Sequence, residues 1–561
     1  MPDSAPQQCN ATQEAPQRII KIRRDYNTWV ANETIEDYAL RFTPRAFRKW
    51  SVFRVSNASF GAISFLVLEA IGGSIAVTYG FTNAFWAIIA VGIVIFFTGL
   101  PISYYAARHG LDMDLLTRGA GFGYIGSTIS SFVYASFTFI LFALEAAIMA
   151  YALRLALGMP LHIGYLVSAL IVIPLVTHGV TLISRVQLAT LPVWICLQVL
   201  PFAYIFAKRP DVLAQLPRFS GQSSTAGFTL AGFGAAMAVG VALVTQIGEQ
   251  VDFLRFMPEE TPHNRLRWHI GVLGAGPGWI VFGMLKMLGG ALLALLAIRS
   301  GVSWADAVNP THMYLAGFRQ VFGDPTLALA VTVFFIVVAQ VKINLTNAYA
   351  GSLAWSNFFA RLTHSHPGRV VWAVFNALIA VLLMELDVFT ALEHVLGLYA
   401  NVAIAWIAAV VADLVINKPL GLSPAGIEFR RAYLYDINPV GVGAMLLASL
   451  ASICAYTGTL GTTAQALSPV VALATALAAA PLIAWLTKGR YYIARAPSPA
   501  HATPRQQTCV ICERSYEAED TAHCPAYQGP ICSLCCCLDA RCDDVCKPHA
   551  RLSAQWEAAA K

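Results

Sequence analysis

Long apolar stretches alternate with short polar connections from about residue 54 to residue 487. Examples are FWAIIAVGIVIFFTGLPISYY (85–105) and WIVFGMLKMLGGALLALLAI (279–298). About 20 apolar residues in a helix are enough to cross roughly 30 Å of hydrocarbon. The pattern therefore predicts about twelve membrane-spanning helices, at 54–79, 84–107, 123–153, 162–179, 186–207, 228–250, 270–298, 326–356, 370–386, 388–416, 440–457 and 468–487.

Composition excludes a large soluble bundle. Hydrophobic residues make up 57% of the chain and charged residues 12%, whereas about 25% of the residues in ordinary soluble domains are charged. Residues 1–50 are polar and basic, so we expect no cleavable signal peptide. These features predict an all-α polytopic membrane protein embedded in a lipid bilayer.

Basic residues predict the orientation of the helices. They gather before the first span and after the even-numbered spans, as at Arg108, Arg185, Arg361 and Arg430. Because Lys and Arg favour cytoplasmic connections, we expect both termini to face the cytoplasm, at the plasma (inner) membrane. The net charge of +6 is attributed to that face, and no nucleic-acid partner is expected.

Four stretches carry a family resemblance: ARHGLDMDLLTRGAGFGYIGS (107–127), EQVDFLRFMPEE (249–260), QVKINLTNAYAGSLAW (340–355) and VADLVINKPLG (411–421). Together, over about residues 25–490, they resemble the nucleobase:cation symporter family, which includes purine–cytosine permeases and hydantoin or allantoin transporters. The resemblance implies a five-plus-five inverted-repeat (leucine-transporter-like) fold with two extra helices. It also implies that helices 1 and 6 are interrupted where the substrate binds, between spans 1, 3, 6 and 8.

The implied activity is secondary-active transport of a nucleobase-like, hydantoin- or allantoin-like compound. The sequence shows no nucleophile–base pairing and no phosphate loop, so we do not expect an enzyme. Glu145 falls where the family places a substrate-binding glutamine; the alternative is an ion pair with a lysine of another helix. The other expected polar contacts are Gln246, Asn344 and Asn347.

Two departures from the family pattern bear on the substrate. Leu141 and Leu243 stand where relatives have tryptophans that sandwich an aromatic ring. Phe137, Phe139 or Phe142 are the possible aromatic replacements. An apolar slot is less specific for a ring than a stacking pair, so a small amide-bearing heterocycle or ureide is expected.

Lys342 bears on ion coupling. It stands, with Ile343, where the family supplies hydroxyls to sodium, and an ammonium group has no lone pair with which to bind a cation. No sodium site is therefore expected. Proton coupling, a site locked without ion exchange, and a lysine turned to the interface all remain open. Glu69 and Lys286 also lie within spans and need partners: they belong to a proton path, or pair with each other or with Lys342.

Asp252 and Arg255 follow the sixth span. We expect them to belong to a cytoplasmic gate network; a purely structural role at the helix end is the alternative.

The chain changes character near residue 488, after which it holds nine of its twelve cysteines. The expected domains are an N-terminal segment (1–53), the twelve-helix body (54–487), a linker (488–508), a cysteine module (509–549) and a C-terminal tail (550–561). Cys509-x2-Cys512 and Cys532-x2-Cys535 have the spacing of a structural zinc site. The remaining candidate ligands, sufficient for a second zinc, are Cys524, Cys536, Cys537, Cys542 and Cys546.

An iron–sulfur cluster is the alternative metal centre, and disulfides are disfavoured in the cytoplasm. Two functions stay open for the whole chain. One is a permease that uses a proton rather than sodium. The other is a transporter-derived sensor that relays ligand binding through the cysteine module to a cytoplasmic protein partner.

Overall fold

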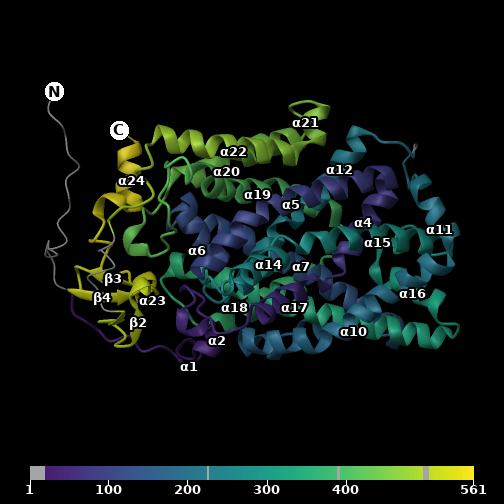
Figure 1. Cartoon of the computed structure of the whole chain (residues 1–561), viewed down its shortest axis with the longest axis horizontal. Coiled ribbons are helices and arrows are strands. Elements are labelled where there is room, and N and C mark those ends of the chain that lie inside the picture. The colour runs from purple at the N-terminus through teal and green to yellow at the C-terminus, as the bar shows by residue number, and fades with distance from the viewer. Residues whose placement is uncertain (1–18, 224–225, 388–391, 497–504, 561) are drawn as a thin grey trace.

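The computed structural model describes residues 19–223, 226–387, 392–496 and 505–560. Its apolar part is a bundle of long helices packed side by side (Figure 1). Among the described residues, nine helical segments are long and apolar enough to cross a membrane, and one bent pair makes a tenth. The unbroken ones are α5 (Phe81–His109), α7 (Ser127–Leu157), α10 (Gly179–Lys208), α17 (Pro325–Thr363), α19 (Leu392–Ala412), α20 (Pro439–Tyr456) and α22 (Ser468–Leu486).

Over its described residues, each predicted span coincides with a helix or a broken helix. Positions 388–391, at the start of the predicted span 388–416, lie outside the described residues. The predicted span at 162–179 is the shorter pair α8 (Leu161–Leu170) and α9 (Ile173–Thr177), and the one at 370–386 is α18 (Arg369–Glu385). The seventh span consists of α14 (Arg265–Ala275) and α15 (Trp279–Arg299). Short helices connect or flank the spans: α6 (Met113–Thr117), α11 (Pro210–Gln215), α16 (Pro310–Val321) and α21 (Thr462–Ala466). Helix α13 (Ile247–Leu254) is the second half of the sixth span.

Both spans that the resemblance implies to be interrupted do change conformation midway. In the first span, α3 (Val52–Gly61) passes through the 3₁₀ turn η2 (Ala62–Ser64) into α4 (Val67–Tyr79), with a bend of 41°. In the sixth, α12 (Leu230–Val241) passes through η5 (Ala242–Gln246) into α13. Such interruptions free backbone groups that must find other partners in the bundle interior.

Two glycines let α4 and α15 approach to backbone contact. A Cβ atom at Gly72 would lie 1.8 Å from the carbonyl oxygen of Met287, and one at Gly290 would lie 2.1 Å from that of Glu69. No side chain larger than hydrogen fits at either position. This close packing places Lys286 of α15 against the interrupted first span.

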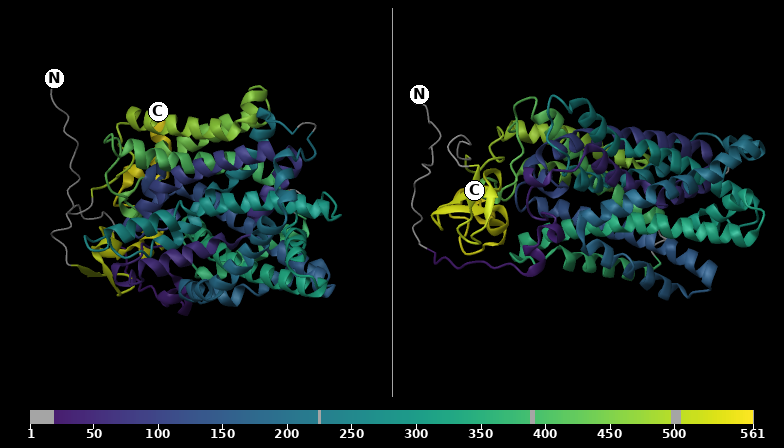
Figure 2. Two further views of the ribbon diagram at one scale, coloured as in Figure 1. Left: turned by 45° about the vertical axis from the view of Figure 1, so that its right-hand side comes forward. Right: turned by 60° about the horizontal axis from the view of Figure 1, so that its bottom comes forward.

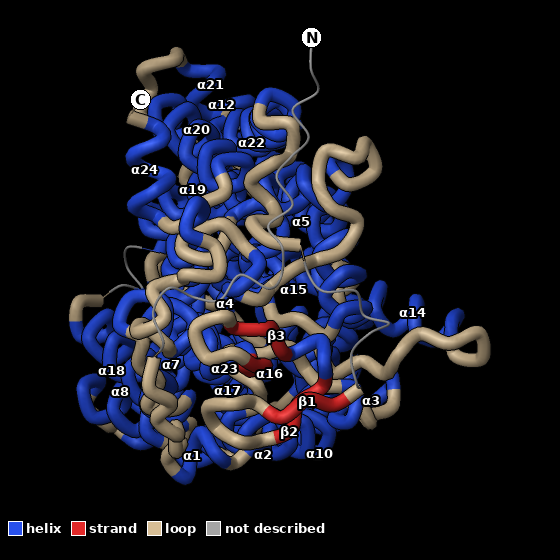
Figure 3. The backbone as a smooth tube through the Cα atoms, turned by 90° about the vertical axis from the view of Figure 1, so that its left-hand side faces the viewer, coloured by secondary structure: helices blue, strands red, loops and turns tan. Residues whose placement is uncertain are grey.

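The cysteine module lies at one end of the bundle, together with α1 (Thr28–Ala31) and α2 (Glu33–Glu36), as Figures 1 and 2 show. Figure 3 faces this end and shows its strands. Strands β1 (Gln506–Thr508) and β2 (Ser515–Glu517) form one antiparallel pair, and β3 (Thr521–Cys524) and β4 (Gly529–Cys532) form another. Helices α23 (Ser533–Leu538) and α24 (Leu552–Ala559) follow. Part of the predicted linker, 497–504, lies outside the described residues.

Candidate functional site

The carboxylate of Glu145, on α7, caps the helix that resumes after the first break. Its two oxygens accept hydrogen bonds from the backbone N–H groups of Leu66 (3.1 Å) and Val67 (3.0 Å). The first N–H groups of a helix have no partner within the helix, and a negative charge is favoured there. Glu145 therefore stabilises the start of α4, and both of its oxygens are engaged.

On the other side of the same break, Lys286 binds the free backbone carbonyl groups. Its ammonium donates to the carbonyl oxygens of Ile63 (3.1 Å) and Phe65 (2.8 Å). It also forms an ion pair with Glu69 at 3.4 Å. The break is thus held by a carboxylate on its N–H groups and an ammonium on its carbonyls. Of the partners considered for Glu69, the structure places Lys286 beside it.

Glu69 has two further hydrogen bonds. Tyr314 of α16 donates its hydroxyl to one carboxylate oxygen at 2.7 Å, and Gln198 of α10 donates its amide to the same oxygen at 3.0 Å. Four helices therefore meet at this carboxylate: α4, α10, α15 and α16.

Lys342 lies on α17 and points towards α10. Its ammonium donates to the side-chain oxygen of Gln187 (2.6 Å), the backbone oxygen of Gln187 (3.2 Å) and the hydroxyl of Thr190 (3.1 Å). The ring of Trp194 lies 6.0 Å from this ammonium and 5.5 Å from that of Lys286. The structure thus sets two buried lysines around one indole, with Lys286 rather than Lys342 bonded to the carbonyls of the break.

The second break and the facing part of α17 carry buried polar atoms without partners. Gln246 donates to Glu249 at 2.9 Å, and Asn347 donates to Asn344 at 3.1 Å. These four side chains and that of Gln340 are at most 1% exposed. The unbonded atoms are Gln246 Oε1, Glu249 Oε1, Gln340 Oε1 and Nε2, Asn344 Nδ2 and Asn347 Oδ1. Because native proteins pair nearly all buried polar atoms, this concentration makes the region the candidate ligand site.

Glu249 and Gln340 were not among the residues predicted from the sequence. The available signal was a carboxylate inside the apolar span 228–250, and an amide one helical turn before Asn344. Both lie in the stretches quoted for the resemblance, and only their unbonded buried atoms in the folded chain distinguish them from their neighbours.

One aromatic pair, Phe137 of α7 and Tyr399 of α19, lies beside the second break. Phe137 stacks on Tyr399 with ring centroids 6.3 Å apart, and the hydroxyl of Tyr399 lies 3.2 Å from that of Thr245 in η5. Leu141 and Leu243 are buried. Phe139 instead stacks on Trp355 of α17 at 6.2 Å.

Arg255, predicted at a gate, joins the sixth span to the N-terminal segment. Its guanidinium donates to the backbone oxygen of Asp37 (2.6 Å) and to the hydroxyl of Tyr349 (2.9 Å), and lies 3.7 Å from the carboxylate of Asp112. Asp252 accepts a hydrogen bond of 2.7 Å from Tyr134. Both residues are buried.

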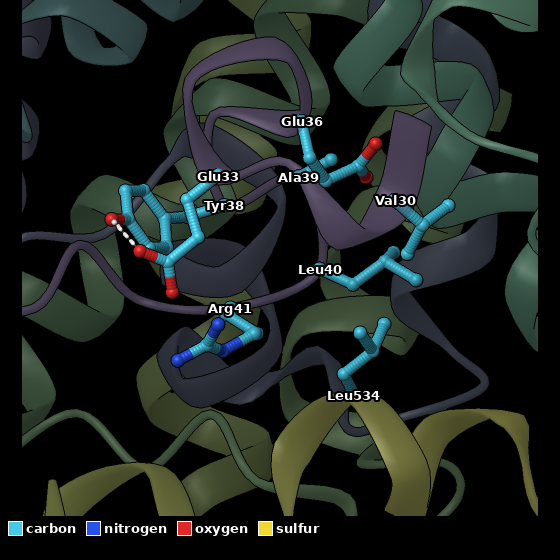
Figure 4. A pocket seen from close by; sticks show the side chains of 8 residues that line it. All are labelled: Val30, Glu33, Glu36, Tyr38, Ala39, Leu40, Arg41 and Leu534. Atoms are coloured by element: carbon cyan, nitrogen blue, oxygen red, sulfur yellow. Dashed lines mark hydrogen bonds between the residues drawn. The ribbon is translucent and has the colours of Figure 1, made fainter. Parts of the chain in front are cut away.

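Residues 24–43, here called the strap, connect Arg255 to the cysteine module. Arg41 forms a 2.6 Å ion pair with Asp520, which is fully buried. Tyr26 shares a hydrogen bond of 2.8 Å with the thiol of Cys535, and the guanidinium of Arg24 donates to the Cys535 backbone at 3.2 Å. Figure 4 shows strap side chains facing Leu534 of α23 across a small depression.

Asp37 is a titratable strap residue in direct contact with Arg255. Its carboxylate accepts a hydrogen bond of 2.6 Å from the Val180 backbone and lies 3.8 Å from Arg369. Burial raises the pKa of Asp37 from 3.8 to about 6, against the opposing effect of Arg369 and Arg255.

Four cysteines of the module form a compact group. The Sγ atoms of Cys509, Cys512, Cys532 and Cys535 all lie within 4.8 Å of one another, and all four side chains are buried. The sulfurs of Cys512 and Cys532 are 4.0 Å apart, against about 3.8 Å for two thiolates on a tetrahedral zinc with bonds of about 2.3 Å. The donor set and spacing fit zinc.

The other module cysteines lie elsewhere. Cys537 faces the bundle, where its thiol is 3.9 Å from the guanidinium of Arg118. The thiols of Cys524 and Cys542 share a hydrogen bond. Burial raises the pKa of the Cys536 thiol, and Cys542 and Cys546 lie close enough to raise it further.

The chain matches no family model and no curated protein sequence. It does resemble solved structures. Mhp1, a nucleobase-cation-symport-1 family transporter, in a closed conformation with bromovinylhydantoin bound, is 17% identical with a TM-score of 0.57, over 81% of this chain and 95% of that chain. The inward-facing conformation of Mhp1 is 18% identical with a TM-score of 0.57, over 84% of this chain and 96% of that one.

A Na⁺-coupled sialic acid symporter in a substrate-bound outward-open state is 12% identical with a TM-score of 0.55, over 81% of this chain and 92% of that chain. The chain has the fold of these symporters. The predicted leucine-transporter-like, five-plus-five inverted-repeat class is confirmed, and the protein is an integral membrane protein. Its structural neighbours are transporters and not enzymes.

Proposed function

We propose that this protein is a secondary-active permease of the nucleobase:cation symporter type, located in the plasma membrane with both termini in the cytoplasm. The observation that carries the proposal is the group of unbonded, buried polar atoms beside the two interrupted helices. The interruptions of such folds line the substrate site. The fold itself, shared with cation-coupled symporters, is compatible with alternating access.

The unbonded atoms favour a substrate that carries both N–H donors and carbonyl acceptors. Asn344 Nδ2 can donate, whereas Gln246 Oε1 and Asn347 Oδ1 can accept. Amides, ureides, hydantoins and nucleobases present both kinds of group on adjacent ring or chain atoms. The buried Leu141 and Leu243 would supply an apolar boundary, and the hydantoin held by Mhp1 belongs to the same chemical class.

The lysine at the first break supports a cation-independent or proton-linked cycle. A sodium ion at the carbonyls of Ile63 and Phe65 would have to displace the Lys286 ammonium that they already accept. Lys342 is likewise bonded to α10 and offers no lone pair. We therefore propose that sodium does not drive transport, and that Lys286 and Glu69 form part of the proton path.

Uptake into proteoliposomes tests both proposals. Labelled uracil, hydantoin and allantoin would be offered under a pH gradient, a sodium gradient or neither. We expect accumulation of at least one compound under the pH gradient. Asn347→Ala should lose this accumulation, whereas the control Gln222→Ala, at an exposed residue, should retain it. Accumulation that requires sodium would contradict the coupling proposal. Binding without accumulation under either gradient would contradict transport itself.

We further propose that Cys509, Cys512, Cys532 and Cys535 hold one structural Zn²⁺. Four thiolates complete a tetrahedral shell and leave no open position for catalysis. A module of about 40 residues also has a core too small to fold readily without such a cross-link. The five other cysteines remain candidates for a second metal.

A sensor is the second candidate function, and the strap is the observation that favours it. Arg255 holds Asp37, and Arg41, four residues further along, holds Asp520 of the module. A conformational change at Arg255 would therefore change the stability of the module. By thermodynamic linkage, a change in the module would alter the conformational equilibrium at Arg255 to the same extent. Hydrogen exchange of residues 505–550 with and without a bound ligand tests this coupling; unchanged exchange would contradict a relay.

A further inference from the structure

Glu249 is a buried carboxylate for which the described residues supply no cation. It is fully buried one turn after the second break, with one oxygen bonded to Gln246 at 2.9 Å and the other unbonded. Among the described residues, the one charged group that acts on it electrostatically is another carboxylate, Glu145. Burying an ionised carboxylate without a compensating charge is strongly unfavourable, so the site is electrostatically incomplete.

The two lysines of the bundle interior are engaged elsewhere. Lys286 bonds to the carbonyls of the first break and to Glu69. Lys342 bonds to Gln187 and Thr190 of α10. Glu145 is compensated by two backbone N–H groups at a helix start. Unlike Glu69 and Glu145, Glu249 therefore has no compensating positive charge or helix start among the described residues.

Glu249 and Gln246 are spaced three residues apart, so their side chains lie on one face of the helix. Each has one oxygen without a partner. Two acceptors side by side, one of them charged, complement two N–H donors on nitrogens attached to one carbon atom. That pattern is the edge of a protonated amidine or of a guanidine.

We propose that Glu249 is the anionic anchor of the substrate site and that the substrate presents an amidine- or guanidine-like edge to it. The inference rests on the proposed transport function and narrows its substrate class. It also assigns the specificity to the sixth helix, whereas Glu145, which the resemblance places at the ligand, is occupied with the first helix.

Benzamidine and benzamide make a matched pair of probes, equal in shape but different in charge and in the number of N–H donors. Their binding to the purified full-length protein would be measured by titration calorimetry. A charge-assisted hydrogen bond predicts that benzamidine binds about 10- to 100-fold more tightly than benzamide. In Glu249→Gln this preference should fall to within about 3-fold.

Glu385→Gln is the control, because Glu385 is exposed at the end of α18; its preference should equal that of the unaltered protein. Glu249→Asp keeps the charge and should retain part of the preference, which separates loss of the anchor from misfolding. Equal binding of the two probes by the unaltered protein, no binding of either, or a preference that survives in Glu249→Gln overturns the inference. Uptake of neutral hydantoin or uracil alongside any of these results would leave the transport proposal standing.

Discussion

The guanidinium of Arg255 donates a hydrogen bond of 2.6 Å to the backbone carbonyl of Asp37, and both residues are buried. This contact joins the end of the sixth span to a strap that begins on the cysteine module. The strap is the physical link between the two parts of a chain that differ so clearly in composition.

Removing the Arg41 side chain should release the strap from the module. Arg41→Ala leaves the buried carboxylate of Asp520 without its ion-pair partner, and breaking a buried pair by removing one member costs about 3–5 kcal/mol. We expect faster hydrogen exchange in residues 28–43. Arg23→Ala is the matched control, because its pair with Glu513 is exposed and such pairs contribute about 0–1 kcal/mol. Equal exchange in the two variants would show that the pair does not hold the strap.

Zinc removal should have the same effect on the strap as Arg41→Ala. Tyr26 and Arg24 both contact Cys535, a member of the four-cysteine group. Cys509→Ser and Cys532→Ser should each lose one zinc per chain by elemental analysis and increase exchange in the strap. Cys196→Ser, at an exposed cysteine of the bundle, should do neither. A brown protein with visible absorbance would instead indicate an iron–sulfur cluster.

Glu145→Ala should destabilise the protein more than Glu145→Gln. The alanine variant leaves the N–H groups of Leu66 and Val67 without acceptors, and a hydrogen bond to a charged group is worth about 1.5–3 kcal/mol. Glutamine retains one acceptor oxygen. The thermal midpoint of detergent-solubilised protein measures the difference, and equal midpoints would mean that the break does not depend on this carboxylate.

Glu69 and Lys286 should behave as a pair in a double-mutant cycle. Each single variant, Glu69→Gln or Lys286→Met, loses the partner of a buried charge, so each should lower stability by about 3–5 kcal/mol. The double variant should be less destabilised than the sum of the two, because no charge is left unpaired. Strict additivity of the three thermal or denaturant midpoints would argue against coupling.

Strap docking should weaken as pH rises through about 6, the raised pKa of Asp37 in the folded protein. A carboxyl whose pKa is raised on folding binds its proton more tightly in the folded state, so its contribution is complete below 3.8 and is lost as pH rises through the folded value. Strap exchange, corrected for intrinsic pH dependence, should therefore increase between pH 5 and 7, about one unit either side of that pKa.

Asp37→Asn should remove this dependence. Asn tolerates the left-handed backbone of position 37, where φ is 49°. Asp211→Asn, on α11 at the opposite end of the bundle, serves as the control (Figure 1). A pH dependence that persists in Asp37→Asn would assign it to another group.

The long apolar stretches were sufficient to predict the helices, because a segment that crosses a bilayer must be apolar along its whole length and must satisfy its own backbone. The cysteine spacing likewise predicted that Cys509, Cys512, Cys532 and Cys535 would gather, since two residues between cysteines bring both thiols to one turn. Apolar helix length and cysteine spacing are both local properties of the sequence, because each is defined within a few residues to a few tens of residues.

The pairing of charged side chains within the bundle cannot be predicted in this way, because it depends on which helices contact each other. The sequence marked Glu145, Glu69, Lys286 and Lys342 as charges in need of partners, but offered several partners for each. Tertiary packing decided among them: backbone contact at Gly72 and Gly290 brings Lys286 to the first break, while the Lys342 side chain turns to Gln187.

By itself, then, the sequence determined that this is a many-helix membrane protein with a cysteine module, because burial in lipid and thiolate spacing impose local patterns. Only the tertiary structure decided that Glu145 is occupied by the first break, that one oxygen of Glu249 is left unbonded, and that the strap joins the module to Arg255. These are relations between residues as far apart as Arg41 and Asp520. A pair of that separation leaves no periodic trace in the chain, since its free energy depends on burial and geometry that exist only after folding.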